Sequence, residues 1–215
     1  MPVITIRGQL GSGAPDIGKL VADKLHIDYV DREIIARVAE FLIRGDKDVI
    51  LKEMPPSSLL GRISEALEHN AYYRASVYLP AWEMPLEDTQ YLTGLNSVIN
   101  DLVRGGAIVI RGRGGQFILK DLPGALHVFV VAPLDLRVKR VMESSKAKEN
   151  EARKEIELFD SSHHEFARRY FHAVLEDPVN YDLVINTENV NFNDAVSVII
   201  DALPLKQKTA IPGKG

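Results

Sequence analysis

Short apolar runs alternate with patterns of helical period along most of the chain. Four of these runs, and a weaker fifth just before Asp31, predict strands. The last three are almost continuously apolar, which is typical of strands buried on both faces. The alternation predicts an α/β fold with a helix-covered parallel sheet. The predicted strands are residues 3–7, 27–30, 107–111, 126–132 and 182–186, and the predicted helices are residues 16–25, 32–43, 134–143, 149–175 and 193–203.

Residues 44–104 interrupt this alternation with two helix-period stripes, separated by Pro80 and Pro85. About 60 residues with two apolar stripes need the main body to complete a core, so this segment is interpreted as a helical insertion. Residues 1–205 then form a single domain. Residues 206–215 are basic and lack apolar periodicity, which predicts a flexible tail.

Aromatic residues gather inside the insertion. Two interpretations stay open: they line a base-binding or homodimer surface, or they pack in the ordinary way against the sheet. The residues concerned are Tyr72, Tyr73, Tyr78 and Trp82.

Composition narrows the class of protein. A net charge of -4 gives no general attraction to nucleic acid or anionic membranes, so neither is expected as a partner. The absence of cysteine excludes disulfides, thiolate metal sites and a cysteine nucleophile. No apolar run approaches the ~18 residues that span a bilayer, and the chain opens directly into a strand. These features predict a cytoplasmic protein.

The first strand leads into a glycine-rich loop that carries Gly8, Gly11 and Gly13. A strand, a glycine loop and a helix in this order place backbone N–H groups around phosphate, although a simple tight turn is the alternative. Ser12 is the hydroxyl inside the loop, and Ala14 stands where the usual phosphate-binding loop has lysine. Losing that lysine removes a charge worth roughly 10²–10³ in rate.

Other candidates follow the predicted strands. Asp31 ends the second strand and also suits a helix N-cap, with Arg37 one turn further on. Arg113 lies in a glycine turn after the third strand, where it is aimed at phosphate; RNA binding through that Arg-Gly-Gly turn is a weaker alternative. Arg137 and Arg140 share one face of a later helix.

Adjacent His163 and His164 invite a metal site. Neighbouring side chains on a helix point about 100° apart, so the pair does not predict a shared ion, and no metal site is expected.

Five segments in order resemble the cytidylate-kinase-like family of P-loop nucleoside monophosphate kinases: PVITIRGQLGSG, VDREII, IVIRGRGGQFIL, HVFVVAPLDLRVKRV and YDLVINTENV. The resemblance implies a three-layer P-loop kinase fold, with a five-stranded parallel sheet, an acceptor-binding insertion at 44–104 and a lid at 143–165. It also implies transfer of the ATP γ-phosphoryl group, with Mg²⁺, to a pyrimidine monophosphate or similar nucleotide acceptor.

The resemblance also implies roles for individual residues. Arg113, Arg137 and Arg140 would be catalytic cations, with Arg137 and Arg140 facing donor phosphates. Arg37 and Arg113 would hold the acceptor phosphate, and Asp160 its sugar. The nucleotide-binding set is Gly8, Gly11, Ser12, Gly13, Asp31, Arg37 and Asp160.

Several positions depart from the family pattern, as in a divergent branch without the loop lysine. Besides Ala14, Gly114 replaces the aspartate of the Gly-Arg-Asp motif, and Ile156 and His163 replace lid arginines. Two functions therefore stay open: a phosphotransferase, and a catalytically silent nucleotide-binding or scaffolding protein on the same fold.

Overall fold

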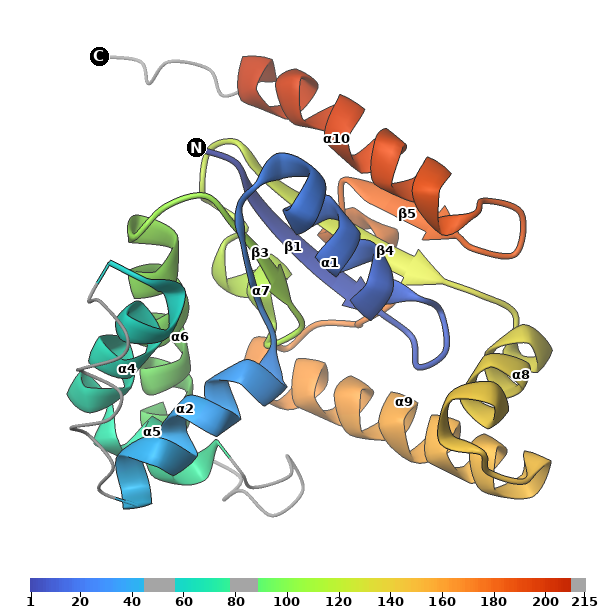
Figure 1. The fold of residues 1–215 in the computed structure, drawn as a ribbon, viewed down its shortest axis with the longest axis horizontal. Coiled ribbons are helices and arrows are strands. Elements are labelled where there is room, and N and C mark those ends of the chain that lie inside the picture. The colour runs from blue at the N-terminus through green and yellow to red at the C-terminus, as the bar shows by residue number, and fades with distance from the viewer. Residues whose placement is uncertain (45–56, 78–88, 210–215) are drawn as a thin grey trace.

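A computed structural model describes residues 1–44, 57–77 and 89–209, and its centre is a parallel sheet in the order β2-β3-β1-β4-β5 (Figure 1). The strands are β1 (Val3–Gly8), β2 (Asp28–Val30), β3 (Ile108–Arg111), β4 (Ala125–Val131) and β5 (Leu183–Asn186). All four strand pairings are parallel. The predicted α/β fold with a five-stranded parallel sheet is confirmed.

Helices cover both faces of the sheet because the central strands are apolar on both faces. On β1, Ile4 and Ile6 pack with α1 (Ala14–Leu25) and α10 (Phe192–Thr209), whereas Val3 belongs to the core on the opposite face. All six residues of β1 are buried, as a strand in the middle of three layers requires.

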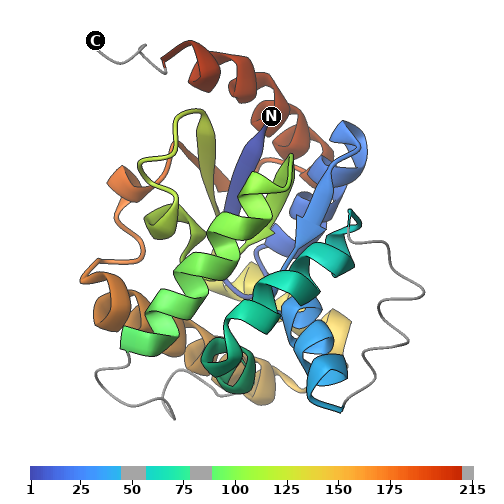
Figure 2. The same ribbon diagram turned by 90° about the vertical axis from the view of Figure 1, so that its left-hand side faces the viewer.

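Four helices of the described residues gather at one side of the sheet (Figures 1 and 2). Their apolar stripes share one core with β2 and β3, in which Ile63, Leu95 and Ile110 are fully buried. The helices are α2 (Arg32–Arg44), α4 (Leu59–His69), α5 (Ala71–Ser76) and α6 (Thr89–Arg104).

Of the aromatic residues predicted in the insertion, the structure describes the side chain of Tyr73. Tyr73 has no exposed surface and its ring lies 5.3 Å from that of Tyr91, so Tyr73 packs as an ordinary core residue. Tyr78, Trp82 and the side chain of Tyr72 lie outside the described residues.

Two long helices flank the carboxyl edge of the sheet. α8 (Leu134–Ser145) packs on α9 (Glu149–Phe171), and α9 runs from α8 to the side of the insertion (Figure 1). Ile156, which replaces a lid arginine of the family, is 1 % exposed in a small core between α8 and α9. The short helix α7 (Gly115–Ile118) and a 3-10 turn, η2 (Pro178–Asn180), complete the described elements.

Three predictions made from the sequence are wrong in detail. β5 is not buried on both faces, because it is an edge strand in which Val184 is 49 % exposed. The helix predicted for 149–175 ends at Phe171, where His172 takes a left-handed conformation. Residues 206–209, predicted as the start of a flexible tail, continue α10, in which Leu203 is buried and Lys206 pairs with Asp182 directly before β5.

Candidate functional site

The glycine loop wraps around the amino end of α1. Gly11 and Gly13 have φ angles of 80° and 90°, a left-handed region that L side chains rarely adopt. Ser12 is fully buried, and its Oγ makes no hydrogen bond within the described part of the chain. An orphaned hydroxyl inside a loop of backbone N–H groups at a helix N-terminus suits an anionic ligand.

Ala14 fills the space beside the first glycine of the loop. A Cβ added at Gly8 would lie 2.1 Å from the Cβ of Ala14 and 2.8 Å from the Ser12 Oγ. Gly8 and Ala14 are therefore packed against each other at the base of the loop, and neither residue carries a charged side chain.

Arg140 braces the loop from α8. Its guanidinium donates to the carbonyl oxygens of Gly11 and Ser12 at 3.2 and 3.3 Å, and to the Thr187 Oγ1 at 2.8 Å. The Thr187 Oγ1 in turn donates to the Ser12 carbonyl at 2.8 Å. Arg140 is thus at the predicted loop, but its hydrogen bonds go to protein oxygens.

A hollow lies beside Gly13, lined by Arg140, Thr187, Asn191 and Phe192 among others. A Cβ at Gly13 would lie 2.2 Å from the Phe192 ring, and the Arg140 guanidinium stacks 5.3 Å from that ring. Phe192 and Arg140 thus make a cation–π contact beside the loop, with the Phe192 ring packed against Gly13.

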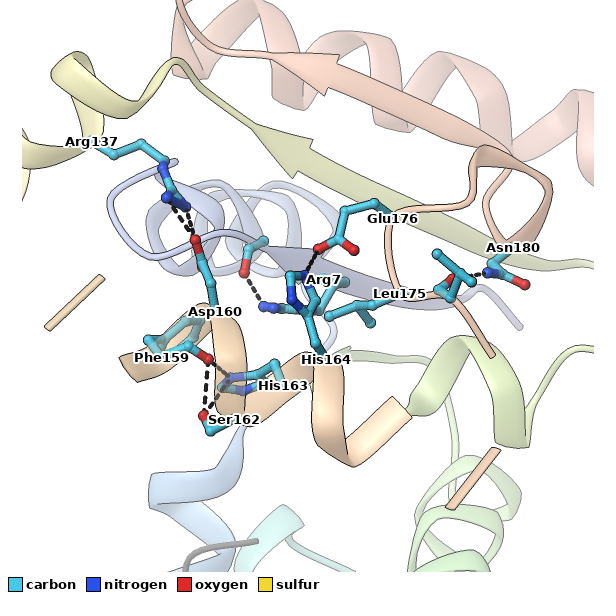
Figure 3. Close-up of polar contacts among 12 residues, drawn as sticks. Arg7, Arg137, Phe159, Asp160, Ser162, His163, His164, Leu175, Glu176 and Asn180 are labelled. Carbon is cyan, nitrogen blue, oxygen red and sulfur yellow. Dashed lines mark hydrogen bonds and ion pairs between the residues drawn. The ribbon is translucent and has the colours of Figure 1, made fainter. Parts of the chain in front are cut away.

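Arg137, which is buried, and Asp160, which is half-buried, form an ion pair between α8 and α9 (Figure 3). Both guanidinium nitrogens donate to the Asp160 Oδ2, at 2.8 and 2.7 Å. The Asp160 Oδ1 is buried and makes no hydrogen bond in the described chain, and burial raises the pKa of this carboxyl even though Arg137 opposes the shift. These two predicted site residues are therefore brought to each other.

A cavity of about 340 Å³ opens at the carboxyl ends of β1 and β3, next to Gly8. This volume lies in the range of small-molecule sites. One wall comes from Glu155, Leu158, Phe159 and His163 of α9. Four arginines also line the cavity: Arg7, Arg32, Arg111 and Arg113. Three further aromatic residues line it with them: Tyr91, Phe117 and Phe166.

Arg113 takes a left-handed φ of 59° in the glycine turn after β3, and its Nη1 donates to the Tyr91 hydroxyl at 3.0 Å. Gly114 lets this turn approach α9, because a Cβ there would lie 2.5 Å from the Phe171 ring. Arg113 lines the cavity, as an acceptor-phosphate residue must.

Asp31 caps α2 instead of facing the cavity. Its carboxylate accepts from the Ile34 N–H at 3.0 Å and from the Tyr29 hydroxyl at 3.1 Å. Burial favours a higher pKa for Asp31, but the Ile34 N–H and the Arg111 charge outweigh it and lower the pKa. Arg111 also pairs with Glu33 at 3.1 Å.

Arg37 is exposed on α2 and does not line the cavity, whereas Arg32, nearer the start of the same helix, does. The role of Arg37 stays a prediction.

Sequence reasoning missed Arg7. This arginine lies on β1, is 6 % exposed and lines the cavity. A charged residue in the middle strand of a buried sheet, directly before the first glycine of the loop, is a signal that the sequence already carries.

His163 faces the cavity and His164 faces away, toward Glu176 (Figure 3). Burial and the charge of Arg7 lower the pKa of His163 to about 3, so its imidazole is neutral near pH 7. Among the described residues, no group of three or more His, Asp or Glu side chains is arranged to hold a metal ion.

Comparisons with known proteins bear on the family and the fold. A model of the cytidylate kinase-like family matches residues 3–189. A cytidylate kinase of Sulfolobus acidocaldarius is 25 % identical over 203 residues, 94 % of each chain. A solved structure of an uncharacterized protein from Eubacterium ventriosum superimposes with a TM-score of 0.63 at 20 % identity, covers 95 % of this chain and 99 % of its own, and supports the fold.

One similarity is partial. A uronate isomerase of Corynebacterium glutamicum is 32 % identical over 108 residues, which are 50 % of this chain but 21 % of that protein. The chain spans about a fifth of that relative, so the match carries no activity over to it.

Proposed function

The chain belongs to the cytidylate kinase-like family, and we propose that it moves the γ-phosphoryl group of ATP to a nucleoside monophosphate or a similar acceptor. Family and fold support the coarser statement, a nucleotide kinase-like phosphotransferase on a P-loop kinase fold. What supports the finer statement is the arginine-lined cavity beside Gly8, because it joins an anion-binding site to a phosphate-type loop.

The donor belongs on the loop side. Gly8, Gly11, Ser12 and Gly13 fit a triphosphate, since the loop presents N–H groups and the orphaned Ser12 Oγ. ATP, carrying Mg²⁺ on its phosphates, would supply the phosphoryl group. Arg140 holds the loop in shape for it.

The acceptor belongs in the cavity. Arg113 would bind the acceptor's phosphate, and the aromatic walls would hold a flat base. Phosphoryl transfer needs mainly positioning and charge neutralisation, which arginines on rigid strands can provide. We propose that residues 44–104 contribute to acceptor binding and that residues 143–165 act as a lid, with Asp160 and Arg137 at its hinge to the loop. Arg37 would bind acceptor phosphate once that lid closes.

A coupled assay of ADP formation across a panel of nucleoside monophosphates tests the proposal. We expect turnover with at least one pyrimidine monophosphate. Binding of ATP without ADP formation above buffer for every acceptor would contradict it.

The variant Arg113→Met sharpens the test. It removes the cation that binds Tyr91 on the cavity wall, and we expect a loss of roughly 10²–10³ in kcat/KM. Arg168→Met is the matched control, because Arg168 is exposed and pairs only on the surface with Glu165 among the contacts shown for it, so turnover should not change.

A silent nucleotide-binding protein is the second candidate. It is favoured by Ala14 and by the two loop-side arginines, Arg137 and Arg140, whose hydrogen bonds go to protein oxygens. Calorimetry separates the candidates, since a sensor binds ATP or CMP without turnover and a scaffold binds neither.

We also propose a cytoplasmic location, and a homodimer through the insertion as a partner surface. None of the described helices has the length and hydropathy to cross a membrane. Sedimentation of the full chain tests the dimer.

A further inference from the structure

Arg7 is a buried cation on the central strand. Parallel strands β3 and β4 flank β1 on both sides, and only 6 % of Arg7 is exposed. Its side chain is on the face of β1 opposite Ile4 and Ile6 and reaches the cavity, where its guanidinium lies 5.4 Å from the Phe159 ring.

Protein groups satisfy this guanidinium only in part. The Arg7 Nη1 donates to the carbonyl oxygen of Gly8, while the buried Nε makes no hydrogen bond in the described chain. The acids whose fields it feels are engaged elsewhere: Asp160 with Arg137, and Glu176 with His164 (Figure 3). No carboxylate of the described residues lies within ion-pair distance of Arg7.

Three other buried or half-buried arginines have such a partner, whereas Arg113, which lines the same cavity, has no carboxylate partner among the described residues. Arg137 pairs with Asp160, Arg111 with Glu33 and Arg62 with Asp28. Arg7, like Arg113, lacks such a partner among the described residues. Burial lowers the pKa of Arg7 to about 10, against the fields of Tyr181 and Asp160, so the group is still a cation at neutral pH. Burying a charge without a counter-ion is unfavourable, and this protein does so at the wall of a cavity.

We propose that Arg7 receives an oxyanion of the acceptor, a phosphate monoester or a group of like charge and shape, where the cavity meets the glycine loop. The ligand then supplies the counter-ion that the protein withholds. This inference rests on the proposed function in one respect, that the cavity takes an anionic acceptor. Arg7 is then a binding residue for the acceptor, and its guanidinium is a cation beside a loop that lacks the usual lysine.

The variant Arg7→Met tests this, because methionine fills a similar volume without charge. In phosphate-free buffer we expect it to melt above the wild type by about 2–4 °C, since an uncompensated buried charge is gone. We expect its dissociation constant for CMP to rise about tenfold or more, and the thermal shift caused by inorganic phosphate to disappear.

Arg168→Met is the matched control. Arg168 lies outside the insertion and pairs with Glu165 on the exposed surface of α9, so its loss should leave both CMP binding and the melting temperature close to those of the wild type. Arg7→Lys keeps the charge and should recover part of the affinity for CMP, which a role in shape alone would not produce.

The inference is overturned if Arg7→Met melts below the wild type or gives no folded protein, because Arg7 is then structural. It is equally overturned if the variant keeps the wild-type affinity for CMP and the phosphate shift, or if the wild type binds neither probe. None of these readouts needs turnover. A wild type that binds CMP through Arg7 but forms no ADP with any acceptor removes the proposed function alone.

Discussion

The glycine loop and the cavity next to it treat their arginines in opposite ways. On the loop side, Arg137 and Arg140 bind protein oxygens, a carboxylate in one case and loop carbonyls in the other. On the cavity side, Arg111 pairs with Glu33, but Arg7 and Arg113 have no carboxylate partner among the described residues. Position near a phosphate loop therefore does not make an arginine a phosphate ligand; its existing partners decide whether it holds the fold or is left for a ligand.

Breaking the Arg137 pair is the largest expected effect. In Arg137→Met the half-buried carboxylate of Asp160 loses its counter-ion, and we expect the free energy of unfolding to fall by about 3–4 kcal/mol, toward the lower end for breaking a buried pair. Chemical denaturation at pH 7 measures this. The loss should shrink toward acidic pH, because burial already raises the pKa of Asp160 and protonation removes the charge.

The double variant Arg137→Met with Asp160→Leu is the control for this effect. Removing both charges should restore most of the lost stability. If the single variant were as stable as the wild type and only nucleotide binding suffered, Arg137 would belong with Arg7, and the contrast between the two regions would disappear.

Gly11→Ala tests how tightly the loop is held on α8. A Cβ there would lie 2.6 Å from the carbonyl oxygen of Arg137, at a φ of 80°. Gly112→Ala is the matched control, with a φ of 75° and no atom within 4 Å of the added Cβ. We expect the control to cost about 1–2 kcal/mol for its backbone conformation, and Gly11→Ala a further 1–3 kcal/mol for the clash, or about 3 kcal/mol together.

Equal losses for the two alanine variants in thermal or urea unfolding would mean that the loop moves away from α8 freely. The loop side would then be adaptable rather than held by its arginines.

The sequence predicts the fold better than the site, for physical reasons that particular residues illustrate. Apolar periodicity predicts the bounds of β1 and α1 to within two residues, because the buried positions of both elements set that periodicity. The same periodicity overestimates the burial of β5, because an apolar run does not reveal whether a strand has neighbours on one side or on both. Family resemblance names Arg137 and Asp160, but only the packing of α8 on α9 brings them together. The resemblance assigns no role to Arg7, and its missing counter-ion is visible only in three dimensions.

Protonation of His163, on the cavity wall, changes the stability of the protein at acidic pH. Burial lowers its pKa to about 3 in the folded protein, from 6.5 when exposed, so the unfolded chain binds the extra proton. Stability from this group is present above pH 6.5 and is lost as the pH falls, by about 2 kcal/mol at pH 5. His163→Gln should remove that part of the loss between pH 7 and pH 5 in urea unfolding.

His164→Gln controls for the histidine itself, because His164 is exposed on the next position of α9. If the two glutamine variants lose the same stability between pH 7 and pH 5, the imidazole of His163 is protonated in the folded state as readily as in the unfolded chain. The positive charge of the cavity would then not come from its arginines alone.

The smallest effect is expected at Arg140, and it bears on what the loop-side arginines are for. Lysine keeps the charge but cannot make the fork of bonds to Gly11, Ser12 and Thr187, so Arg140→Lys should lower the free energy of unfolding by about 1 kcal/mol. Arg153→Lys is the control, as Arg153 pairs only with acids on the helix surface in the contacts described for it. If the hydrogen-bond geometry of Arg140 holds the loop in shape, Arg140→Lys lowers the ATP affinity together with the free energy of unfolding. If only the charge of Arg140 matters, the variant keeps the wild-type ATP affinity and stability. The second result would place Arg140 with Arg7 as a cation left for phosphate, and the division between the two sides of the site would have to be redrawn.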